Sequence, residues 1–459
     1  NVNPLYTARE LEHQLKDSGA SAIVILENFA ATLSEVIEHT QIQHTVLASI
    51  GDLLGPFYGR WMTFAVRHLA KMVPEFELPL SDKHKVTSFK QAISEGRQLT
   101  FKSVPQSLDD IAFLQYTGGT TGLSKGAVLT HRNIVAAILQ AETWFAPALE
   151  RMPDLRKVNS IAALPLYHIF ALTLCLLAIR QGSHLTLVPN PRDFGKFIET
   201  LKTRPFHLMP GVNTLFNALL QHPMFKTIDF SHLCLTQAGG MAASEGTARA
   251  WQAATGSAMI EGWGMSETCA IGTNNPVTQT SFSGSIGLPL PSIDMAIKDE
   301  QGNSLAQGES GEICIRGPNV MVGYYKQEEE TRKAFTPDGY MRTGDVGIMD
   351  EKGFFRIVDR KKDMVVTGGI NVYPRQIEEL LYRHPAVQEA AVIGVPDEQW
   401  GERLKGFIVC REGMGATAEE LIEFLKPQLS SYKIPREFDF LAELPRNPSG
   451  KILKRALRP

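Results

Sequence analysis

The sequence is short of cysteine, carries no excess of basic residues and has little uninterrupted apolar sequence. Its five cysteines are too far apart in the chain for a metal-binding pair, which favours reduced thiols in a cytoplasmic protein. The formal net charge of −3 argues against a general nucleic-acid binder, because such proteins carry a basic surface. The first residues also lack the basic and then apolar pattern of a secretory signal.

The longest stretch without a charged residue is IAALPLYHIFALTLCLLAI, at 161–179. It is about long enough to span a bilayer. However, Pro165, Tyr167 and His168 divide it into a short strand-like run and a helix-like run. We therefore expect a buried strand, a loop and a helix here rather than a membrane span.

With 459 residues the chain is too long for one compact core, so two or three packed units are expected. From residue 111 onward, apolar runs alternate with glycine loops and helix-like segments, which predicts an α/β unit with largely parallel strands. These runs are IAFLQYTGG, SIAALPLY, SHLTLVP and HLCLTQAGG. Two short runs nearer the start, SAIVIL (21–26) and HTVLAS (44–49), are further candidates for buried strands.

The amino-acid pattern changes towards the C-terminus. Residues 284–358 are rich in strand-like runs and glycine turns, which predicts a β-rich subdomain. The charged run RKKD after Asp359 has the character of a hinge. We therefore expect a large N-terminal domain of layered, mostly parallel sheets at 1–358 and a small, mobile α+β lid domain at 359–459, with the hinge at 359–362.

Residues 56–74, PFYGRWMTFAVRHLAKMVP, can form an amphipathic helix with basic residues away from its apolar face. The apolar face comprises Phe57, Trp61, Phe64, Ala65, Leu69 and Met72. Such a helix can lie on a membrane surface, or it can pack onto its own domain. The sequence leaves both interpretations open.

The segment with the clearest chemistry is Tyr116–Gly126, which reads YTGGTTGLSKG and comes after an apolar run. Glycines allow a close approach of the backbone to a ligand, hydroxyl and N–H groups donate to phosphate oxygens, and lysine offsets negative charge. The segment therefore predicts a phosphate-binding loop. It does not fit the GxxxxGK[ST] pattern, because Ser124 precedes Lys125 and a glycine comes next.

A second glycine-containing segment, EGWGMSE (261–267), does not match the dinucleotide-binding motif GxGxxG, because Glu267 stands where the third glycine is needed.

YTGGTTGLSKG is similar to the signature loop of the adenylate-forming enzymes, which include acyl-CoA synthetases, adenylation domains and firefly-type luciferases. Six further segments resemble that family's motifs in order and spacing. They are LPLYHIF (164–170), QAGGM (237–241), EGWGMSET (261–268), RTGD (342–345), DRKKDMVVTGG (359–369) and NPSGKILKR (447–455). Long stretches look most like bacterial long-chain fatty-acid–CoA ligases, which carry roughly 100 further residues ahead of the NVNPLY segment.

The resemblance implies a site for ATP and Mg²⁺. It assigns ATP binding to Thr117, Gly118, Gly119, Thr120, Thr121, Gly122, Lys125, Gly239, Gly262, Trp263, Gly264, Ser266, Asp345 and Arg360. In this set Trp263 flanks the adenine, while Asp345 and Arg360 contact the ribose. Glu267 is implied to hold Mg²⁺.

The resemblance also assigns catalysis, the acyl site and the hinge. Catalytic roles fall to Lys451, Glu267 and His168, with Lys451 bridging the carboxylate and the α-phosphate. The acyl pocket is assigned to His168, Gly211, Val212, Gly240 and Met241, and the hinge and coenzyme A tunnel to Lys362, Gly368 and Gly369.

The acyl group is predicted from what the pocket segments lack. An amino-acid substrate would need a buried carboxylate to pair with its ammonium group, whereas 207–220 and 237–241 offer apolar and small residues. We therefore expect a hydrocarbon acyl group. The resemblance implies that it is a long-chain fatty acid and that coenzyme A accepts it. We also expect a cytoplasmic protein, with 56–74 as a candidate for peripheral contact with the inner membrane surface. Two alternatives remain: an enzyme that loads a carrier protein, and a truncated fatty-acid or nucleotide binder without turnover. Whether the chain forms a homodimer stays open.

Overall fold

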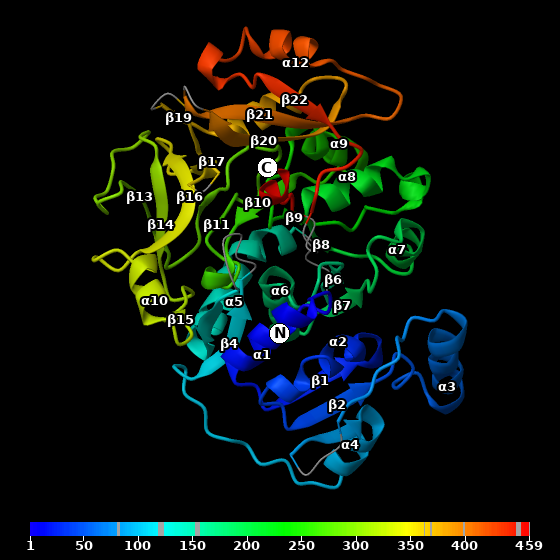
Figure 1. The fold of residues 1–459 in the computed structure, drawn as a ribbon. Coiled ribbons are helices and arrows are strands. Elements are labelled where there is room, and N and C mark those ends of the chain that lie inside the picture. Colours follow the sequence, from blue (N-terminus) through cyan, green and yellow to red (C-terminus); the bar gives the residue numbers. More distant parts are fainter. Residues whose placement is uncertain are drawn as a thin grey trace. The chain divides into compact units, whose positions relative to one another are not determined.

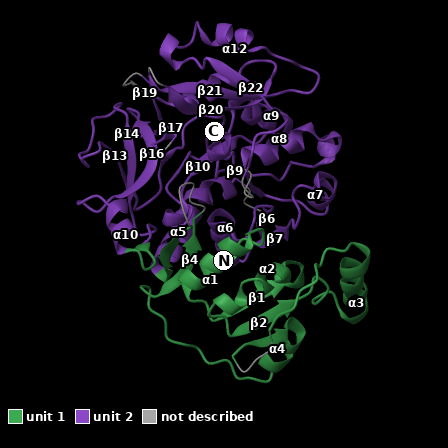
Figure 2. Ribbon diagram, in the orientation of Figure 1, with its two compact units in different colours: residues 1–131, 322–327 green, residues 132–321, 328–459 purple. Residues whose placement is uncertain are grey.

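The computed structural model describes residues 1–79, 83–117, 124–151, 157–361, 363–367, 370–397, 400–446 and 451–458. The chain divides into two compact units (Figure 2). Unit 1 comprises residues 1–131 and 322–327, and unit 2 comprises residues 132–321 and 328–459. The domain boundary predicted at 359–362 falls inside unit 2 and stays a prediction.

Unit 1 contains a small parallel sheet with helices around it. The sheet consists of β1 (Ala22–Leu26), β2 (His44–Ala48) and β3 (Lys85–Ser88). The helices are α1 (Ala8–Ser18), α2 (Ala30–Ser34), α3 (Pro56–Phe64), its π-helical continuation η3 (Ala65–Leu69), and α4 (Phe89–Gly96). Strands are present where they were expected, at 21–26 and 44–49, but the prediction that they are buried was wrong. Exposed and intermediate positions alternate along β1, and in β2 only Thr45 is buried.

Helix α1 has a capping motif at each end. Thr7 and Glu10 form a capping box at its start, and Gly19 ends it with a left-handed backbone at φ 66°. Leu11 and Leu15 bury one face of the helix against Leu33 of α2. The polar residues of α1 are thereby held at fixed positions within unit 1.

A second sheet of unit 1 corrects one expectation. It consists of β4 (Ile111–Tyr116), β5 (Gly126–Thr130) and β15 (Gly323–Tyr324), and all its pairings are antiparallel. The prediction that IAFLQY begins the parallel series was wrong. An apolar run followed by glycines is typical both of a strand-to-helix loop and of a hairpin, and here β4 and β5 form a hairpin whose connecting segment is the predicted phosphate loop.

The main sheet of unit 2 confirms the predicted α/β architecture (Figure 1). Its strand order is β12 (Leu288–Pro289), β11 (Thr273–Asn274), β10 (Met259–Trp263), β9 (Leu235–Ala238), β8 (Leu208–Gly211), β6 (Asn159–Ala162) and β7 (His184–Leu187). The pairings from β10 to β7 are parallel, whereas β11 and β12 run antiparallel.

The helices of this α/β layer are α5 (His131–Leu149), α6 (Ile169–Arg180), α7 (Phe194–Leu201), α8 (Asn213–Gln221) and α9 (Glu245–Thr255). The apolar faces of α7, α8 and α9 enclose a core in which Phe216 and Trp251 are fully buried, with ring centroids 4.8 Å apart. The strand, loop and helix expected at 161–179 are present as β6 and α6. No helix in the described part of the chain is long and apolar enough to cross a membrane.

The rest of unit 2 contains two further sheets. The β-rich region forms an antiparallel sheet of β13 (Asp294–Lys298), β14 (Gly311–Arg316), β16 (Met341–Met349) and β17 (Phe355–Arg360), with α10 (Glu328–Ala334) beside it. The C-terminal α+β region contains β18 (Val365–Thr367), β19 (Ile370–Val372), α11 (Pro374–Leu381), β20 (Val387–Asp397), β21 (Gly401–Cys410), α12 (Ala418–Leu425) and β22 (Glu437–Phe440). This region has its own core, built around Ile377, Val392 and Leu421.

Candidate active site

Three residues predicted to bind nucleotide meet around one buried carboxylate. Asp345 lies on β16 and is 2% exposed. Its Oδ2 accepts a hydrogen bond from Nε1 of Trp263 at 2.9 Å, and its Oδ1 lies 3.1 Å from Nε of Arg360. An ionised carboxylate has about four acceptor sites, so these two neighbours leave capacity for ligand hydroxyl groups. The motifs EGWGMSET, RTGD and DRKKD therefore converge as their order in the family implies.

The backbone conformation around Trp263 explains why two nearby positions, 264 and 272, are occupied by glycine. Cys269 and Ala270 both have a left-handed backbone, at φ 54° and 64°, so the chain turns back sharply after Glu267. A Cβ atom on Gly264 would lie 2.2 Å from the Ala270 carbonyl oxygen. A Cβ on Gly272 would lie 2.5 Å from the Trp263 ring. The turn thus packs directly onto the predicted adenine segment.

We expect Gly264→Ala to destabilise unit 2 by about 2–3 kcal/mol, because the added methyl group must displace backbone. Chemical denaturation followed by far-UV circular dichroism measures this change. Gly246→Ala is the matched control, since a Cβ at that helical position would meet nothing within 4 Å. Equal stability of the two variants would contradict the packing described for Gly264.

A pair of buried amides supports this segment. Gln237 begins the motif QAGGM but was given no role, and Asn274 lies outside the motifs. Nδ2 of Asn274 donates to Oε1 of Gln237 at 3.0 Å. A Cβ on Gly262 would lie 2.7 Å from Nε2 of Gln237, so a larger residue there would displace the Gln237 side chain. Both amides belong to strands whose other residues are mostly buried. Polar residues within such strands are the signal that could have identified them.

The predicted acyl-pocket residues lie where neighbouring parallel strands end. The Gly239 amide, just beyond β9, donates to the Gly211 carbonyl at the end of β8, over 3.2 Å. A Cβ on Gly240 would lie 3.7 Å from Val212, and one on Gly239 would lie 3.2 Å from the Phe170 ring. Ligands of open α/β sheets bind at this carboxyl edge. The structure therefore brings QAGGM, LPLYHIF and PGV together, whereas it does not test which ligand they hold.

His168 and Lys451 are also close enough to interact. His168 caps α6, where its Nδ1 accepts a hydrogen bond from the Phe170 amide at 3.3 Å. Burial lowers the pKa of His168 to about 4, and the positive charge of Lys451 acts in the same direction. His168 is therefore neutral at physiological pH. The charge of the tail lysine thus acts on a residue of the predicted acyl site.

Glu267, which is predicted to bind a metal ion, has a buried side chain. It lies in the short helix η5 (Ser266–Thr268), is 7% exposed, and its backbone oxygen accepts from the Met321 amide at 2.7 Å. The described residues contain no group of three or more histidine, cysteine or acidic residues suited to a metal. One carboxylate combined with substrate phosphates is a common arrangement for Mg²⁺. Glu267 fits that arrangement.

The phosphate loop belongs to unit 1, where its frame is well defined. The Thr117 amide donates to the Lys125 carbonyl at 3.0 Å, which closes the base of the loop. From α1, Asp17 accepts the Tyr116 hydroxyl at 2.6 Å. Nε2 of His13, also on α1, lies 2.8 Å from the Ser124 carbonyl. Burial, together with Asp17, raises the pKa of Tyr116, so the hydroxyl stays protonated.

Several predicted residues lie outside the described part of the chain. In the phosphate loop these are Gly118, Gly119, Thr120, Thr121 and Gly122, and in the hinge segment they are Lys362, Gly368 and Gly369. Their predicted roles stay predictions.

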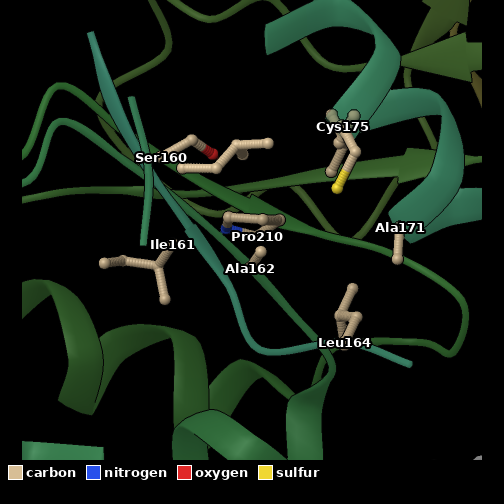
Figure 3. Close-up of a pocket in the computed structure, with 9 residues that line it drawn as sticks. Ser160, Ile161, Ala162, Leu164, Ala171, Cys175 and Pro210 are labelled. Carbon is tan, nitrogen blue, oxygen red and sulfur yellow. The ribbon is translucent and has the colours of Figure 1, made fainter. Parts of the chain in front are cut away.

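A small cavity lies beneath α6 (Figure 3). It is lined by Ser160, Ile161, Ala162, Leu164, Ala171, Leu174, Cys175, Leu185 and Pro210. Its volume of about 10 Å³ holds roughly one water-sized group. The lining is almost entirely apolar, and it adjoins the segments that contain His168 and Gly211. A hydrocarbon chain could enter this space only if lining side chains such as Leu164 moved.

Comparison with known families covers most of the sequence. A model described as AMP-binding enzyme matches residues 1–325, and one described as AMP-binding enzyme C-terminal domain matches residues 376–451.

Individual relatives match along the full length of the chain. The long-chain-fatty-acid–CoA ligase of Salmonella typhimurium is 45% identical over 459 residues, which cover 100% of this chain and 80% of the relative. The ligase of that name from Yersinia pestis is 46% identical with the same coverage. Among solved structures, ATP-bound MatB from Rhodopseudomonas palustris superimposes with a TM-score of 0.81 at 29% identity, covering 100% of this chain and 82% of that one. An anthranilate CoA ligase, AuaEII, in complex with anthranoyl-AMP has a TM-score of 0.81 at 25% identity, covering 99% of this chain and 81% of that one.

Proposed function

This chain belongs to the AMP-binding enzyme family, and on that premise we propose that it converts a long-chain fatty acid to its acyl-adenylate with ATP and then transfers the acyl group to coenzyme A. The observation that carries the proposal is the convergence of Trp263 and Arg360 on Asp345, in a chain that matches long-chain-fatty-acid–CoA ligases throughout. An acceptor-rich carboxylate beside an aromatic ring suits the ribose and adenine of ATP.

The first step requires two anions to approach each other. One carboxylate oxygen of the fatty acid attacks the α-phosphorus of ATP, the bond to the β-phosphate oxygen breaks, and pyrophosphate leaves. Positioning and electrostatic stabilisation provide most of the catalysis in such phosphoryl-group reactions. Lys451 supplies a positive charge near His168, where the carboxylate is expected, and a neutral His168 adds no competing charge.

We assign the binding of the β- and γ-phosphates of ATP to the loop from Thr117 to Lys125. Glu267 is the proposed protein ligand for Mg²⁺. A bound magnesium ion would reduce the negative charge of the triphosphate. In the second step the thiolate of coenzyme A attacks the acyl carbon, the bond from that carbon to the phosphate oxygen breaks, and AMP leaves.

Pyrophosphate–ATP exchange tests the proposal directly. With purified chain, we expect exchange that depends on added fatty acid and rises with chain length, because each buried methylene contributes about 0.8 kcal/mol. Consumption of free coenzyme A then distinguishes a CoA ligase from an enzyme that loads a carrier protein. Absence of fatty-acid-dependent exchange would leave only the binding-protein alternative.

We also propose that α3 and η3 contact a phospholipid surface. Their apolar side chains are exposed, with Phe57 at 89%, Trp61 at 58% and Leu69 at 68%. Arg67 donates a hydrogen bond to Glu27. Arg60 and Lys71, in the same segment, are exposed basic residues. Exposed apolar residues with basic neighbours are typical of helices that lie in a membrane interface.

Trp61→Glu should reduce co-sedimentation with vesicles that contain anionic phospholipid by about tenfold, because a charge replaces apolar surface at the interface. Val104→Glu provides the matched control, since Val104 is 73% exposed but lies outside this helix. If both variants sediment like the wild type, the helix has another role.

A further inference from the structure

Lys454 is a largely buried lysine that has no role in the proposed mechanism. It comes three residues after Lys451 and begins the short helix η7 (Lys454–Leu457). Its Nζ lies 2.8 Å from Oε1 of Glu378 on α11, and both side chains are largely buried. Oε1 of Glu378 also accepts from the Val392 amide on β20, at 2.6 Å. Glu378 is therefore fixed by the C-terminal sheet, and it fixes Lys454 in turn.

The ammonium group of Lys454 also acts on carboxylates near the hinge. Burial acts to lower the pKa of Lys454, but Glu378, Asp359 and Asp363 more than offset this and raise it. Asp359 precedes the hinge residue predicted at 362, whereas Asp363 and Glu378 come after it. Lys454 thus interacts with acidic groups on both sides of the predicted hinge.

Asp359 is itself held in a defined position. It is 3% exposed at the end of β17. Its Oδ1 accepts from the Arg360 amide at 2.6 Å, and its Oδ2 accepts from the Arg375 amide at 2.9 Å. Burial raises the pKa of Asp359 to about 6, while Lys454 acts in the opposite direction. Near neutral pH the carboxylate is ionised and attracts Lys454.

The described residues of the tail also contact the C-terminal region. The Leu453 amide donates to the Pro445 carbonyl at 2.7 Å, and Ile452 forms a bridge with Arg446. Ile452 and Leu457 pack on the outer core of the C-terminal sheet. These contacts would move with that sheet if it turned, whereas the attraction between Lys454 and Asp359 crosses the hinge.

We propose that Lys454 is a positioning residue that ties the tail to both sides of the hinge and thereby holds Lys451 beside His168 for adenylation. The inference rests on the proposed function, because it concerns one of its two half-reactions. A turn of the C-terminal region about the hinge keeps the ion pair of Lys454 with Glu378. The same turn moves the charge of Lys454 away from Asp359, whose Oδ2 accepts from the Arg375 amide one turn before Glu378 on α11. The loss of Lys454 therefore affects acyl-adenylate formation and spares thioester formation.

The test compares the two half-reactions in Lys454→Met and Lys454→Arg, with the full chain. Fatty-acid-dependent pyrophosphate–ATP exchange reports the first half-reaction, and release of AMP from supplied acyl-adenylate and coenzyme A reports the second. We expect Lys454→Met to lower exchange about 10- to 100-fold, as misplacement of a catalytic group does, and to leave thioester formation within about twofold. Lys454→Arg should restore most of the exchange, because it retains the charge. Lys426→Met, at an exposed lysine paired with Glu423, is the matched control and should change neither half-reaction.

Asp359→Asn provides a second variant, because it removes the charge that acts on Lys454 and leaves the pair of Lys454 and Glu378 intact. The asparagine oxygen replaces only one of the two acceptors for the Arg360 and Arg375 amides. The variant should therefore reproduce the selective loss of exchange with a moderately lower thermal unfolding temperature. An equal loss of both half-reactions in both variants, or unchanged exchange in folded Lys454→Met, would overturn the inference. A wild-type chain without exchange would instead refute the proposed function, and this inference with it.

Discussion

Lys451→Ala should lower fatty-acid-dependent pyrophosphate–ATP exchange by about 10²–10³-fold, which is the usual effect of removing one preorganised stabiliser of developing charge. The fatty carboxylate and the α-phosphate are both anionic, and the charge between them peaks in the transition state. Lys451 lies close enough to His168 for its charge to act on that side chain, so it is in place to offset this charge. Rapid-quench measurement of acyl-adenylate in a single turnover determines the adenylation rate directly.

The second half-reaction provides the internal control for this variant. Acyl-adenylate supplied to Lys451→Ala should still react with coenzyme A at close to the wild-type rate, since the α-phosphate is already esterified. Lys451→Arg retains the charge on a longer and wider group, so we expect an intermediate exchange rate. Adenylation at the wild-type rate in Lys451→Ala would show that the tail lysine has no part in the chemistry.

The sequence predicted the site better than it predicted the surroundings of the site. Trp263, Asp345 and Arg360 come from segments far apart in the chain, and they were identified because each segment resembles a family motif. Their contact could not be derived from spacing, because it depends on the register of β16 and β17, which pairs Asp345 with Arg360. Membership of the family confirms the resemblance, while the role of each residue stays a prediction.

The incorrect strand assignment has a local cause. β4 ends in a glycine-rich segment just as β9 does, so the same pattern placed both in the predicted series of largely parallel strands. The segment after the glycines decides the pairing: GAVLT pairs back onto IAFLQY as β5, and only then does a helix begin. Periodicity over a short apolar run does not distinguish these outcomes.

Residues that act through others were missed for a related reason. Lys454 and Glu378 are 76 positions apart by their numbers in the chain, and nothing in either segment marks them as partners. Asn274 was likewise overlooked, and Gln237 was given no role although it begins the motif QAGGM, because the sequence does not show that two buried amides bond to each other. Such pairs become visible only when the packing is known.

Asp345→Asn should weaken ATP binding by about 10- to 100-fold, because a neutral amide replaces the charged acceptor of the ribose hydroxyls. The amide oxygen can still accept from Trp263, so the fold should survive, and Arg360 is half exposed and stays solvated. Affinity for ATP and for 2′,3′-dideoxy-ATP, measured by calorimetry on both proteins, isolates the ribose contribution as a double-mutant cycle does. The wild type should prefer ATP, and Asp345→Asn should bind both nucleotides almost equally, because the hydroxyl groups then have no charged partner to distinguish them. A variant that still prefers ATP as strongly as the wild type would place the ribose elsewhere, and Asp345 would then serve only to hold Trp263 and Arg360.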